Sequence, residues 1–329
     1  MHCELIVAEL LPVPQALRLP ALELCFARGR RARTEPATVE DWLARACALE
    51  AGLPAGALSA LAAGLAAPAQ ASWIRADPVH LEVTHEGLRL VPPEALAIDE
   101  EEARSLAAAL ETPELAPQVV SPGAWVAATR EPPAVHAPAP LALAGRTLTQ
   151  AWPTGADAPH WHARLVELQM ALARHPVNQA REARSAPAIN SLWLWGAGAT
   201  PAAVRAPWAS LGGADLALTG LARAADIGAV GARADAEAWL AALPGHRGRH
   251  AYLVATLRGV RALASAAELA AQLLDIESRW VAPLLAALRA GRIGMLTLHL
   301  PEAGLAIETV RSDLRRIWRR PQPLAAEAS

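Results

Sequence analysis

The residues with the most capacity for chemistry lie in one stretch of the chain, residues 174–198. Both asparagines of the whole sequence, Asn178 and Asn190, fall there, twelve positions apart. One histidine and three arginines accompany them: His175, Arg174, Arg181 and Arg184. Amides and guanidinium forks suit the recognition of a carboxylate or a phosphate, so this stretch predicts anion binding. The same residue types also cap turns and solvate helix ends, and the sequence leaves both interpretations open.

A second candidate cluster lies in the segment WIRADPVH, residues 73–80. Arg75 and Asp77 alternate there with apolar neighbours, as they would at the start of a strand. In the functional interpretation, the carboxylate orients the arginine, which holds an anion. In the alternative interpretation, the two residues form a surface ion pair that contributes little to stability.

The absence of lysine limits the chemistry of the whole chain. All 30 basic residues among the 329 are arginine, against 32 acidic residues and a net charge of −2. This composition excludes a lysine Schiff base, a P-loop lysine and a kinase-type lysine. Any bound anion must be held by arginine, histidine, backbone N–H groups or a metal. The near-zero net charge gives no sign of nucleic-acid binding, and we expect none.

The remaining signals for catalysis are weak. The ten histidines are scattered, and the closest pair, His160 and His162, would diverge on a helix, so no set with metal-ligand spacing emerges. The three cysteines also lack such spacing, and their odd number favours a reducing, cytoplasmic compartment. Cys25 lies near several arginines, but a buried structural role is the simpler interpretation. We therefore predict no catalytic residue, no metal and no cofactor.

The elements that must position these residues alternate between strands and helices. A strand is expected at residues 5–8, a hairpin over 79–90 and another strand at 124–129. Beyond Pro159 we expect helices at 160–174, 220–227, 234–242 and 265–290, and strands at 191–195, 214–219, 251–256, 294–300 and 305–310. This order predicts an α/β fold with a mainly parallel sheet and helices on both faces. A Pro-rich α+β subdomain at 71–155 is expected to interrupt a core formed by 1–70 and 156–329.

Three further segments have a simple interpretation and a sharper one. Residues 51–74 carry no charge, but alanine, glycine and proline dominate them, so we predict a helix near 57–67 and no membrane span. Gly196-Ala-Gly198 lacks the third glycine of a dinucleotide loop and indicates a strand-end turn. The Arg-rich segment 311–321 is expected to be a docked helix, with contact to an acidic partner or RNA as the alternative. The N-terminus has no basic region, so we expect no signal peptide.

Five short segments occur in an order that resembles one protein family. They are WIRADPVHL (73–81), DEEEA (99–103), HPVNQAREAR (175–184), INSLWLWG (189–196) and IWRRP (317–321). Together they are similar to the bacterial RpfE-type regulatory proteins, which are described as phosphoglycerate-mutase-like. That family resembles the archaeal type of cofactor-independent phosphoglycerate mutase, in the alkaline phosphatase superfamily. The resemblance covers roughly residues 70–320 and implies an alkaline-phosphatase-like core.

The resemblance implies that substrate-holding residues are kept while metal-binding residues are lost. The mutases place an aspartate after the first strand, where this chain has Glu9. A DEAGH-like stretch of the mutases corresponds to TLRGVR (256–261), and their Asp-His pair corresponds to Leu298-His299. A two-metal phosphatase centre needs several carboxylate and imidazole ligands, which these segments do not supply.

The resemblance therefore implies a non-catalytic regulatory protein of the RpfE type that binds a small phosphorylated or carboxylate metabolite. The expected ligand-binding residues are Arg75, Asp77, His175, Asn178, Arg181, Arg184 and Asn190. One alternative is an active mutase or phosphatase whose divalent metals are held by residues from the set His246, His250, His299, Glu9 and Asp275. Another is a cytoplasmic adaptor that binds a protein partner through its tryptophans and its Arg-rich C-terminus.

Overall fold

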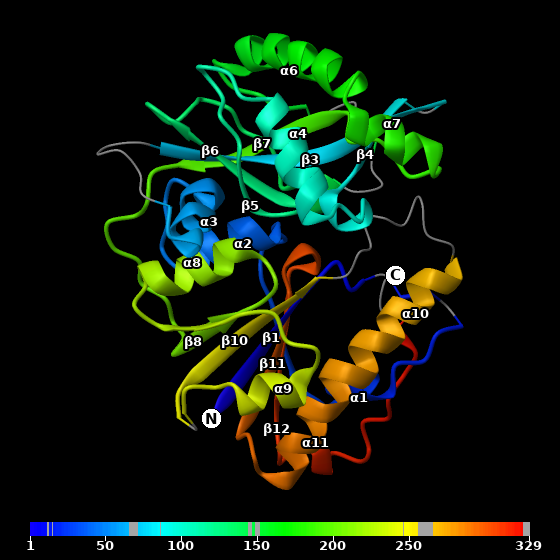
Figure 1. The fold of residues 1–329 in the computed structure, drawn as a ribbon. Helices are drawn as coiled ribbons and strands as arrows, with labels where there is room; N and C mark the ends of the chain where they lie inside the picture. The colour runs from blue at the N-terminus through cyan, green and yellow to red at the C-terminus, as the bar shows by residue number, and fades with distance from the viewer. Residues whose placement is uncertain are drawn as a thin grey trace. The chain divides into compact units, whose positions relative to one another are not determined.

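The computed structural model describes residues 1–11, 13–14, 16–65, 72–85, 87–143, 147–148, 152–245, 247–255 and 266–324 (Figure 1). The chain divides into two compact units. Unit 1 comprises Met1–Glu50, Ala203–Arg258 and Ala264–Ser329, and unit 2 comprises Ala51–Ala202 with Gly259–Leu263. Within the described residues, no helix is long and apolar enough to cross a membrane.

Unit 1 is built on a sheet whose described strands number seven, in the order β2-β12-β11-β1-β10-β8-β9. The strands are β1 (His2–Ala8), β2 (Arg30–Arg33), β8 (Ser210–Gly212), β9 (Gly228–Val230), β10 (Arg249–Ala255), β11 (Met295–Leu300) and β12 (Leu305–Val310). β1 pairs in parallel with β10 and β11, and β8 and β9 continue the parallel arrangement. Only the β12 pairings are antiparallel among these strands. The predicted mainly parallel sheet is confirmed.

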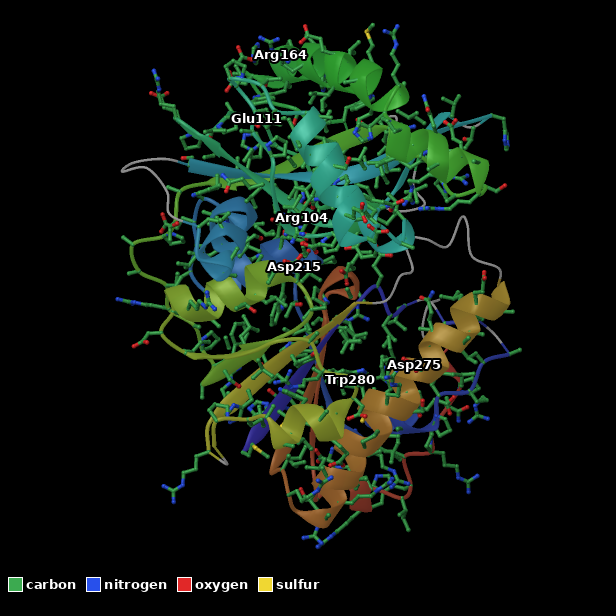
Figure 2. The ribbon with its side chains drawn as sticks, in the orientation of Figure 1. Arg104, Glu111, Arg164, Asp215, Asp275 and Trp280 are labelled. Carbon is green, nitrogen blue, oxygen red and sulfur yellow. The ribbon has the colours of Figure 1, made fainter. Side chains whose placement is uncertain are left out.

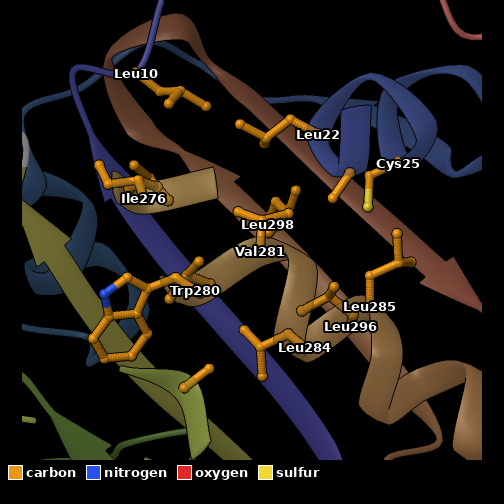
Figure 3. Close-up of a cluster of buried hydrophobic side chains, with 14 of the residues drawn as sticks. Leu10, Leu22, Cys25, Ile276, Trp280, Val281, Leu284, Leu285, Leu296 and Leu298 are labelled. Atoms are coloured by element: carbon orange, nitrogen blue, oxygen red, sulfur yellow. The ribbon is translucent and has the colours of Figure 1, made fainter. Parts of the chain in front are cut away.

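Helices cover both faces of this sheet. They are α1 (Pro20–Arg28), α2 (Val39–Ala46), α8 (Leu216–Ala224), α9 (Ala236–Ala241), α10 (Ala266–Ile276), α11 (Ala282–Ala290), the π-helix η4 (Glu277–Val281) and the 3₁₀ turns η5 (Pro301–Ala303) and η6 (Asp313–Arg315). Leu5 of β1 and Leu298 of β11 are fully buried against α1, η4 and α11, and Figure 3 shows this core. Because side chains alternate along a strand, Glu4 of β1 faces the opposite side. Trp42 of α2 lies there, over His299.

The π-helix η4 joins α10 to α11 without a break and holds α1 in place. Glu277, its first residue, accepts the backbone N–H groups of Ala21 and Leu22 at the start of α1. These N–H groups have no partner within the helix itself, so the carboxylate satisfies them. Burial raises the pKa of Glu277.

Unit 2 contains an antiparallel sheet whose described strands number five, in the order β4-β3-β6-β5, with β7 paired to β3. The strands are β3 (Ser72–Thr84), β4 (Gly87–Val91), β5 (Gln118–Ser121), β6 (Ala124–Thr129) and β7 (Ser191–Gly198). The first part of β3 pairs with β6 and β7, and its last part forms the predicted hairpin with β4. The long strand β3 thus joins all the pieces of this sheet.

Helices also cover both faces of the sheet in unit 2. They are α3 (Ala55–Ala63), α4 (Glu100–Ala109), α5 (Pro140–Leu143), α6 (Ala158–Ala173), α7 (Pro176–Ala183) and the 3₁₀ turn η1 (Pro93–Ala95). On one face, Leu106 of α4 and Leu168 of α6 pack with Ile74 and Leu194 of the sheet. On the other face, Ala57 and Ala60 of α3 pack against Trp73 and Val126.

Small residues let α3 approach the sheet closely. A Cβ atom at Gly56 would lie 2.7 Å from backbone atoms of Ile74. At the end of β7, Gly196 has φ +59°, and a Cβ there would lie 2.7 Å from the Cβ of Ala55. The Gly-Ala-Gly segment therefore serves packing within β7, where its pairing with β3 is irregular, and it does not form the predicted strand-end turn.

Two further predicted elements differ from the structure. Residues 214–219 were expected to form a strand, but α8 begins at Leu216, because the Asp215 side chain accepts the Ala217 N–H at 2.7 Å and caps a helix. The C-terminal segment forms only the short turn η6 instead of a docked helix, and Ile317 and Trp318 are exposed.

The division into units also differs from the predicted insertion at residues 71–155. Unit 2 extends to Ala202 because β7 pairs along β3 and because α6 packs against β7. It begins at Ala51 because α3 packs on β3 and β7. Unit 2 thus includes parts of 51–70 and 156–202 that the sequence assigns to the core, and β7 among them completes the second sheet.

Candidate functional site

Arg75 and Asp77 form a buried ion pair on the face of β3 that α3 covers. The guanidinium Nε and Nη2 donate to the two carboxylate oxygens at 2.8 and 2.9 Å. Nη1 donates to Ser59 Oγ of α3 at 3.1 Å, and the guanidinium lies 5.1 Å from the ring centre of Trp195. Asp77 also accepts the Trp195 Nε1–H at 2.7 Å and the Trp125 backbone N–H at 3.2 Å. The pair is thus a closed internal network and not the exposed pair of the alternative interpretation.

Arg181 joins three parts of unit 2 from a fully buried position on α7. Its Nη1 donates to Glu102 Oε2 at 2.7 Å, and its Nε donates to the Pro187 carbonyl at 2.8 Å. Its Nη2 donates to the Leu96 carbonyl. Arg184, about half exposed, donates to the other oxygen of Glu102. The two arginines therefore share one carboxylate of this chain.

Glu102 holds both arginines because it is part of a capping box. Asp99 Oδ1 accepts the Glu102 N–H at 2.8 Å, and Glu102 Oε2 accepts the Asp99 N–H at 3.4 Å. This reciprocal arrangement fixes the start of α4. The DEEEA segment thus supplies a helix start whose glutamate also anchors α7.

Asn178 and His175 organise the connection from α6 to α7 and β7. Asn178 Nδ2 donates to the carbonyls of Leu172 and Ile189 at 2.8 and 2.7 Å, and its Oδ1 accepts the Ile189 N–H at 2.7 Å. His175 is the N-cap of α7, where its Nδ1 accepts the Val177 N–H at 3.2 Å. Both side chains replace backbone partners that the tight turn lacks.

Asn190 extends the pairing of β7 with β3 beyond the last backbone pair. Its Oδ1 accepts the Leu81 N–H at 2.7 Å, and its Nδ2 donates to the Leu81 carbonyl at 2.9 Å. An amide presents the same donor and acceptor as a peptide unit, so it can take the place of a strand residue. This accounts for an amide at this position without a ligand.

The predicted ligand-binding residues do not meet in one place. Arg75 and Asp77 lie on the α3 face of the unit 2 sheet, whereas Arg181 and Arg184 lie between α4 and α7. α4 packs on the opposite face of the sheet. The alternative that the sequence left open, in which these residues form internal caps and ion pairs without a ligand, accounts for the observed bonds of both clusters.

A polar cluster that the sequence did not reveal lies on β1 of unit 1. Glu4 is buried and accepts hydrogen bonds from His299 Nε2 at 3.0 Å, Trp208 Nε1 at 3.1 Å and Arg249 Nε at 2.5 Å. Trp42 covers the imidazole, with 4.8 Å between the ring centres. Burial alone would raise the pKa of Glu4, but the hydrogen bonds from His299, Arg249 and Trp208 hold it at about 2. A glutamate inside an apolar strand is the only local signal of this cluster.

The histidines of the enzymatic alternative are committed to separate contacts. His250 lies near the amino end of β10, with Nδ1 2.8 Å from Ser210 Oγ and Nε2 3.0 Å from the Arg247 carbonyl oxygen. His299 lies near the carboxyl end of β11 and contacts Glu4. His246 falls outside the described residues. The two described histidines therefore lie toward opposite ends of parallel strands.

The acidic residues of that alternative are also apart. Asp275 lies on α10, where Figure 2 labels it, and pairs with Arg279 at 3.2 Å. Glu9 follows β1, and its backbone N–H donates to the Glu302 carboxylate at 3.0 Å. In the part of the chain that the structure describes, no group of three or more His, Cys, Asp and Glu side chains is arranged to hold a metal.

Carboxylates gather at the carboxyl ends of the parallel strands of unit 1. Glu9 follows β1, Asp215 follows β8 and Glu302 follows β11. Burial, together with the negative charges of Asp215, Glu302 and Asp41, raises the pKa of Glu40 to about 7. Ligands of open α/β sheets bind at this end.

Comparisons with known proteins support the fold. No protein-family profile matches the chain, and no curated protein matches it either. The PH0037 protein from Pyrococcus horikoshii has a similar structure, with a TM-score of 0.50 and 15% identity over 99% of this chain and 92% of that one. A cofactor-independent phosphoglycerate mutase from Thermoplasma acidophilum aligns with a TM-score of 0.41 and 14% identity over 94% of this chain and 89% of that one. At 15% identity, the likeness to the PH0037 protein concerns the fold alone.

Proposed function

We propose that this chain is a non-catalytic regulatory protein, of the RpfE type that its motifs resemble, and that it acts by binding an acidic partner protein. The observation that carries the proposal is an exposed apolar pair in an Arg-rich segment. Ile317 is 73% exposed and Trp318 is 74% exposed, the most exposed Ile and Trp among the described large hydrophobic side chains. Tryptophan and arginine are among the residue types most enriched at the energetic centres of protein interfaces.

The backbone of this segment is held in place. Arg28 of α1 donates to the carbonyls of Leu314 and Arg319 at 2.5 and 3.4 Å. Arg316 donates back to the Arg28 carbonyl at 3.1 Å. Beyond the segment, Leu324 is fully buried in the core of unit 1. An anchored backbone that projects a tryptophan loses little conformational freedom on binding, which favours affinity.

The charge of the segment identifies the chemistry of the partner. Arg311, Arg315, Arg319 and Arg320 are exposed around Ile317 and Trp318. The acidic residue within this segment, Asp313, is buried and paired with Arg316 at 2.9 Å. A protein surface with carboxylates around an apolar pocket complements this arrangement. A nucleic acid offers phosphates to the same arginines, so DNA is the competing ligand in the test.

The proposal is tested with a labelled random copolymer of glutamate and tyrosine, with polyglutamate and a DNA duplex for comparison. Anisotropy should show salt-sensitive binding of the copolymer that is stronger than binding of polyglutamate. The Ile317→Ser/Trp318→Ser double variant should bind the copolymer at least about tenfold more weakly. Met170→Ser, at a residue that is 60% exposed on α6 of unit 2, serves as the matched control and should bind as the wild type. Absence of copolymer binding, or equally tight binding of DNA, would contradict the proposal.

The non-catalytic part of the proposal is supported by the contacts of the expected substrate-holding residues. Arg75 and Arg181 each bond to a carboxylate of this chain. An incoming phosphate would have to displace that carboxylate from a buried site. Thermal melting with 3-phosphoglycerate tests this point, because a ligand that binds only the folded state raises the melting temperature. We expect no rise, and a rise that disappears in Arg181→Met would instead support the metabolite-binding alternative.

A further inference from the structure

The strand β2 forms one edge of the sheet in unit 1, and its outer side pairs with none of the described strands. All residues of this strand, Arg30–Arg33, are exposed, and all but Ala32 are arginine. An exposed strand edge presents backbone N–H and C=O groups that an added strand can bind. The outer edge of β2 therefore offers main-chain groups and positive charge on one short surface.

The pairing of β2 with β12 determines which backbone groups point outward. The N–H of Thr34, the residue after β2, donates to the Gly304 carbonyl at 2.8 Å. Arg33 itself lies opposite Leu305. Hydrogen-bonded and non-hydrogen-bonded pairs alternate in an antiparallel ladder, so Ala32 bonds to β12 whereas the N–H and C=O of Arg33 point away from it. Arg33 can therefore form backbone hydrogen bonds with a strand added outside.

The arginines of β2 differ in how far their charges are already paired. Arg30 pairs with Glu308 of β12 at 2.6 Å, although its side chain is 79% exposed. Arg31 folds back on α1 and donates from Nε and Nη2 to the Phe26 carbonyl at 2.9 and 2.8 Å. Arg33 is exposed, and its guanidinium has no hydrogen bond or ion pair with any described residue. A free cation thus lies beside the outward backbone groups.

The Arg-rich segment 311–321 adjoins this edge of the sheet. Arg28, at the end of α1 and two residues before β2, donates to the carbonyls of Leu314 and Arg319. The segment therefore crosses the end of α1 at the point where β2 begins. At about 3.3 Å per residue, a partner strand of about five residues spans the whole of β2 from that point.

We propose that the acidic partner adds an extended segment rich in Asp and Glu as a strand along the outer edge of β2. This inference rests on the proposed function, because it describes how the same partner continues from the Arg-rich segment onto the sheet. The backbone bonds at Arg33 provide affinity, and its guanidinium selects carboxylates. A second copy of this chain does not fit, because β2 beside β2 would place arginines against arginines.

Two labelled octapeptides of equal charge test the strand addition. One alternates glutamate with valine, which favours a strand, and the other has the same sequence with a methyl group on every backbone nitrogen. The methylated peptide has no N–H to donate to the Arg33 carbonyl. We expect it to bind at least about tenfold more weakly than the unmethylated peptide in anisotropy titrations.

Amide hydrogen exchange, measured by NMR, locates the added strand. The outward N–H of Arg33 should exchange rapidly in the free chain, and saturating unmethylated peptide should slow it at least about tenfold. The Ala32 N–H bonds to β12 in both states, so its exchange should change little. Arg33→Ala keeps the N–H but removes the charge, and should weaken binding about threefold. Arg205→Ala, at an exposed arginine before β8, is the matched control and should bind as the wild type.

Two results would overturn the strand addition: equal binding of the two octapeptides, or exchange of the Arg33 amide that the bound peptide leaves unchanged. Both results are compatible with binding of the glutamate–tyrosine copolymer through Ile317 and Trp318, so they would leave the proposed function standing. Failure of the proposed function is seen separately, as absence of copolymer binding.

Discussion

Replacement of Arg181 by methionine distinguishes a structural arginine from an anion-binding one. Arg181 is fully buried, and its guanidinium bonds to Glu102 and to the carbonyls of Leu96 and Pro187. Methionine fills much of the volume but offers no donor. The change leaves Glu102 with the half-exposed Arg184 alone and leaves two carbonyls without this partner.

The magnitude follows from these contacts. Breaking a buried ion pair from one side costs about 3–5 kcal/mol, because it leaves an uncompensated charge. Each carbonyl that loses its donor adds about 1 kcal/mol, less whatever water regains. Arg184 offsets part of the loss, so we expect Arg181→Met to lower the free energy of unfolding by about 4 kcal/mol. For a unit of this size, that corresponds to a fall in Tm of roughly 10 °C.

Urea unfolding is the assay, with Arg184→Met as the matched control. Arg184 binds the same carboxylate from a side chain that is 52% exposed, so its loss should cost no more than about 1 kcal/mol. Arg181→Lys keeps the charge but not the forked guanidinium, so its loss of unfolding free energy should lie between those of Arg181→Met and Arg184→Met. A loss below about 1 kcal/mol for Arg181→Met would refute the view that Arg181 is a structural residue.

Three further changes test the fold and the charge network. Glu4 has a pKa of about 2 in the folded chain against an ordinary 4.5, so its charge should add about 3 kcal/mol to the free energy of unfolding above pH 5. This contribution is lost progressively as the pH falls toward 2, and Glu4→Gln should remove that pH dependence when unfolding is measured across this range. Gly56→Ala should lower the free energy of unfolding in urea by about 1–2 kcal/mol, because the new Cβ would lie 2.7 Å from the backbone of Ile74. The control Gly231→Ala, where a Cβ would have no neighbour within 4 Å, should leave the free energy of unfolding nearly unchanged. Leu298→Ala, at a fully buried site, should cost about 2–5 kcal/mol in chemical unfolding.

Strands and helices with strong local patterns were predictable from the sequence. β6, β11 and β12 coincide with the expected strands at 124–129, 294–300 and 305–310. The helix expected at 265–290 is present as α10, η4 and α11. The failure at 214–219 arose because its alternating pattern resembles a strand, while one capping bond from Asp215 decides for a helix.

The candidate residues were identifiable by type, but their roles were not. Arg181 donates hydrogen bonds to Glu102, 79 positions away in the sequence, and to the Leu96 carbonyl, 85 positions away. Such partners depend on how α4 and α7 pack, which local periodicity does not encode. Asn190 likewise pairs with Leu81, 109 positions away, only because β7 lies beside β3. Amides and arginines whose types indicate anion binding in a sequence can therefore instead form their hydrogen bonds with other groups of the same folded chain.

Ile317 and Trp318 show the opposite case, because residues predicted to pack inside the protein are exposed in the structure. The spacing of Leu314, Ile317 and Trp318 predicts an apolar helix face that docks. In the structure, Leu314 is partly buried while Ile317 and Trp318 are exposed, because the helix ends after one turn at Arg315. A sequence pattern alone cannot separate an apolar face that packs internally from one that awaits a partner.

Turnover of 3-phosphoglycerate distinguishes a protein that binds a partner without catalysis from an active mutase or phosphatase. The full chain is assayed with magnesium, manganese or zinc present, and formation of 2-phosphoglycerate and release of phosphate are both measured. With every metal, we expect rates equal to those of a reaction without protein. Clear metal-dependent turnover that is lost on Glu9→Gln would contradict it and would establish the enzymatic alternative.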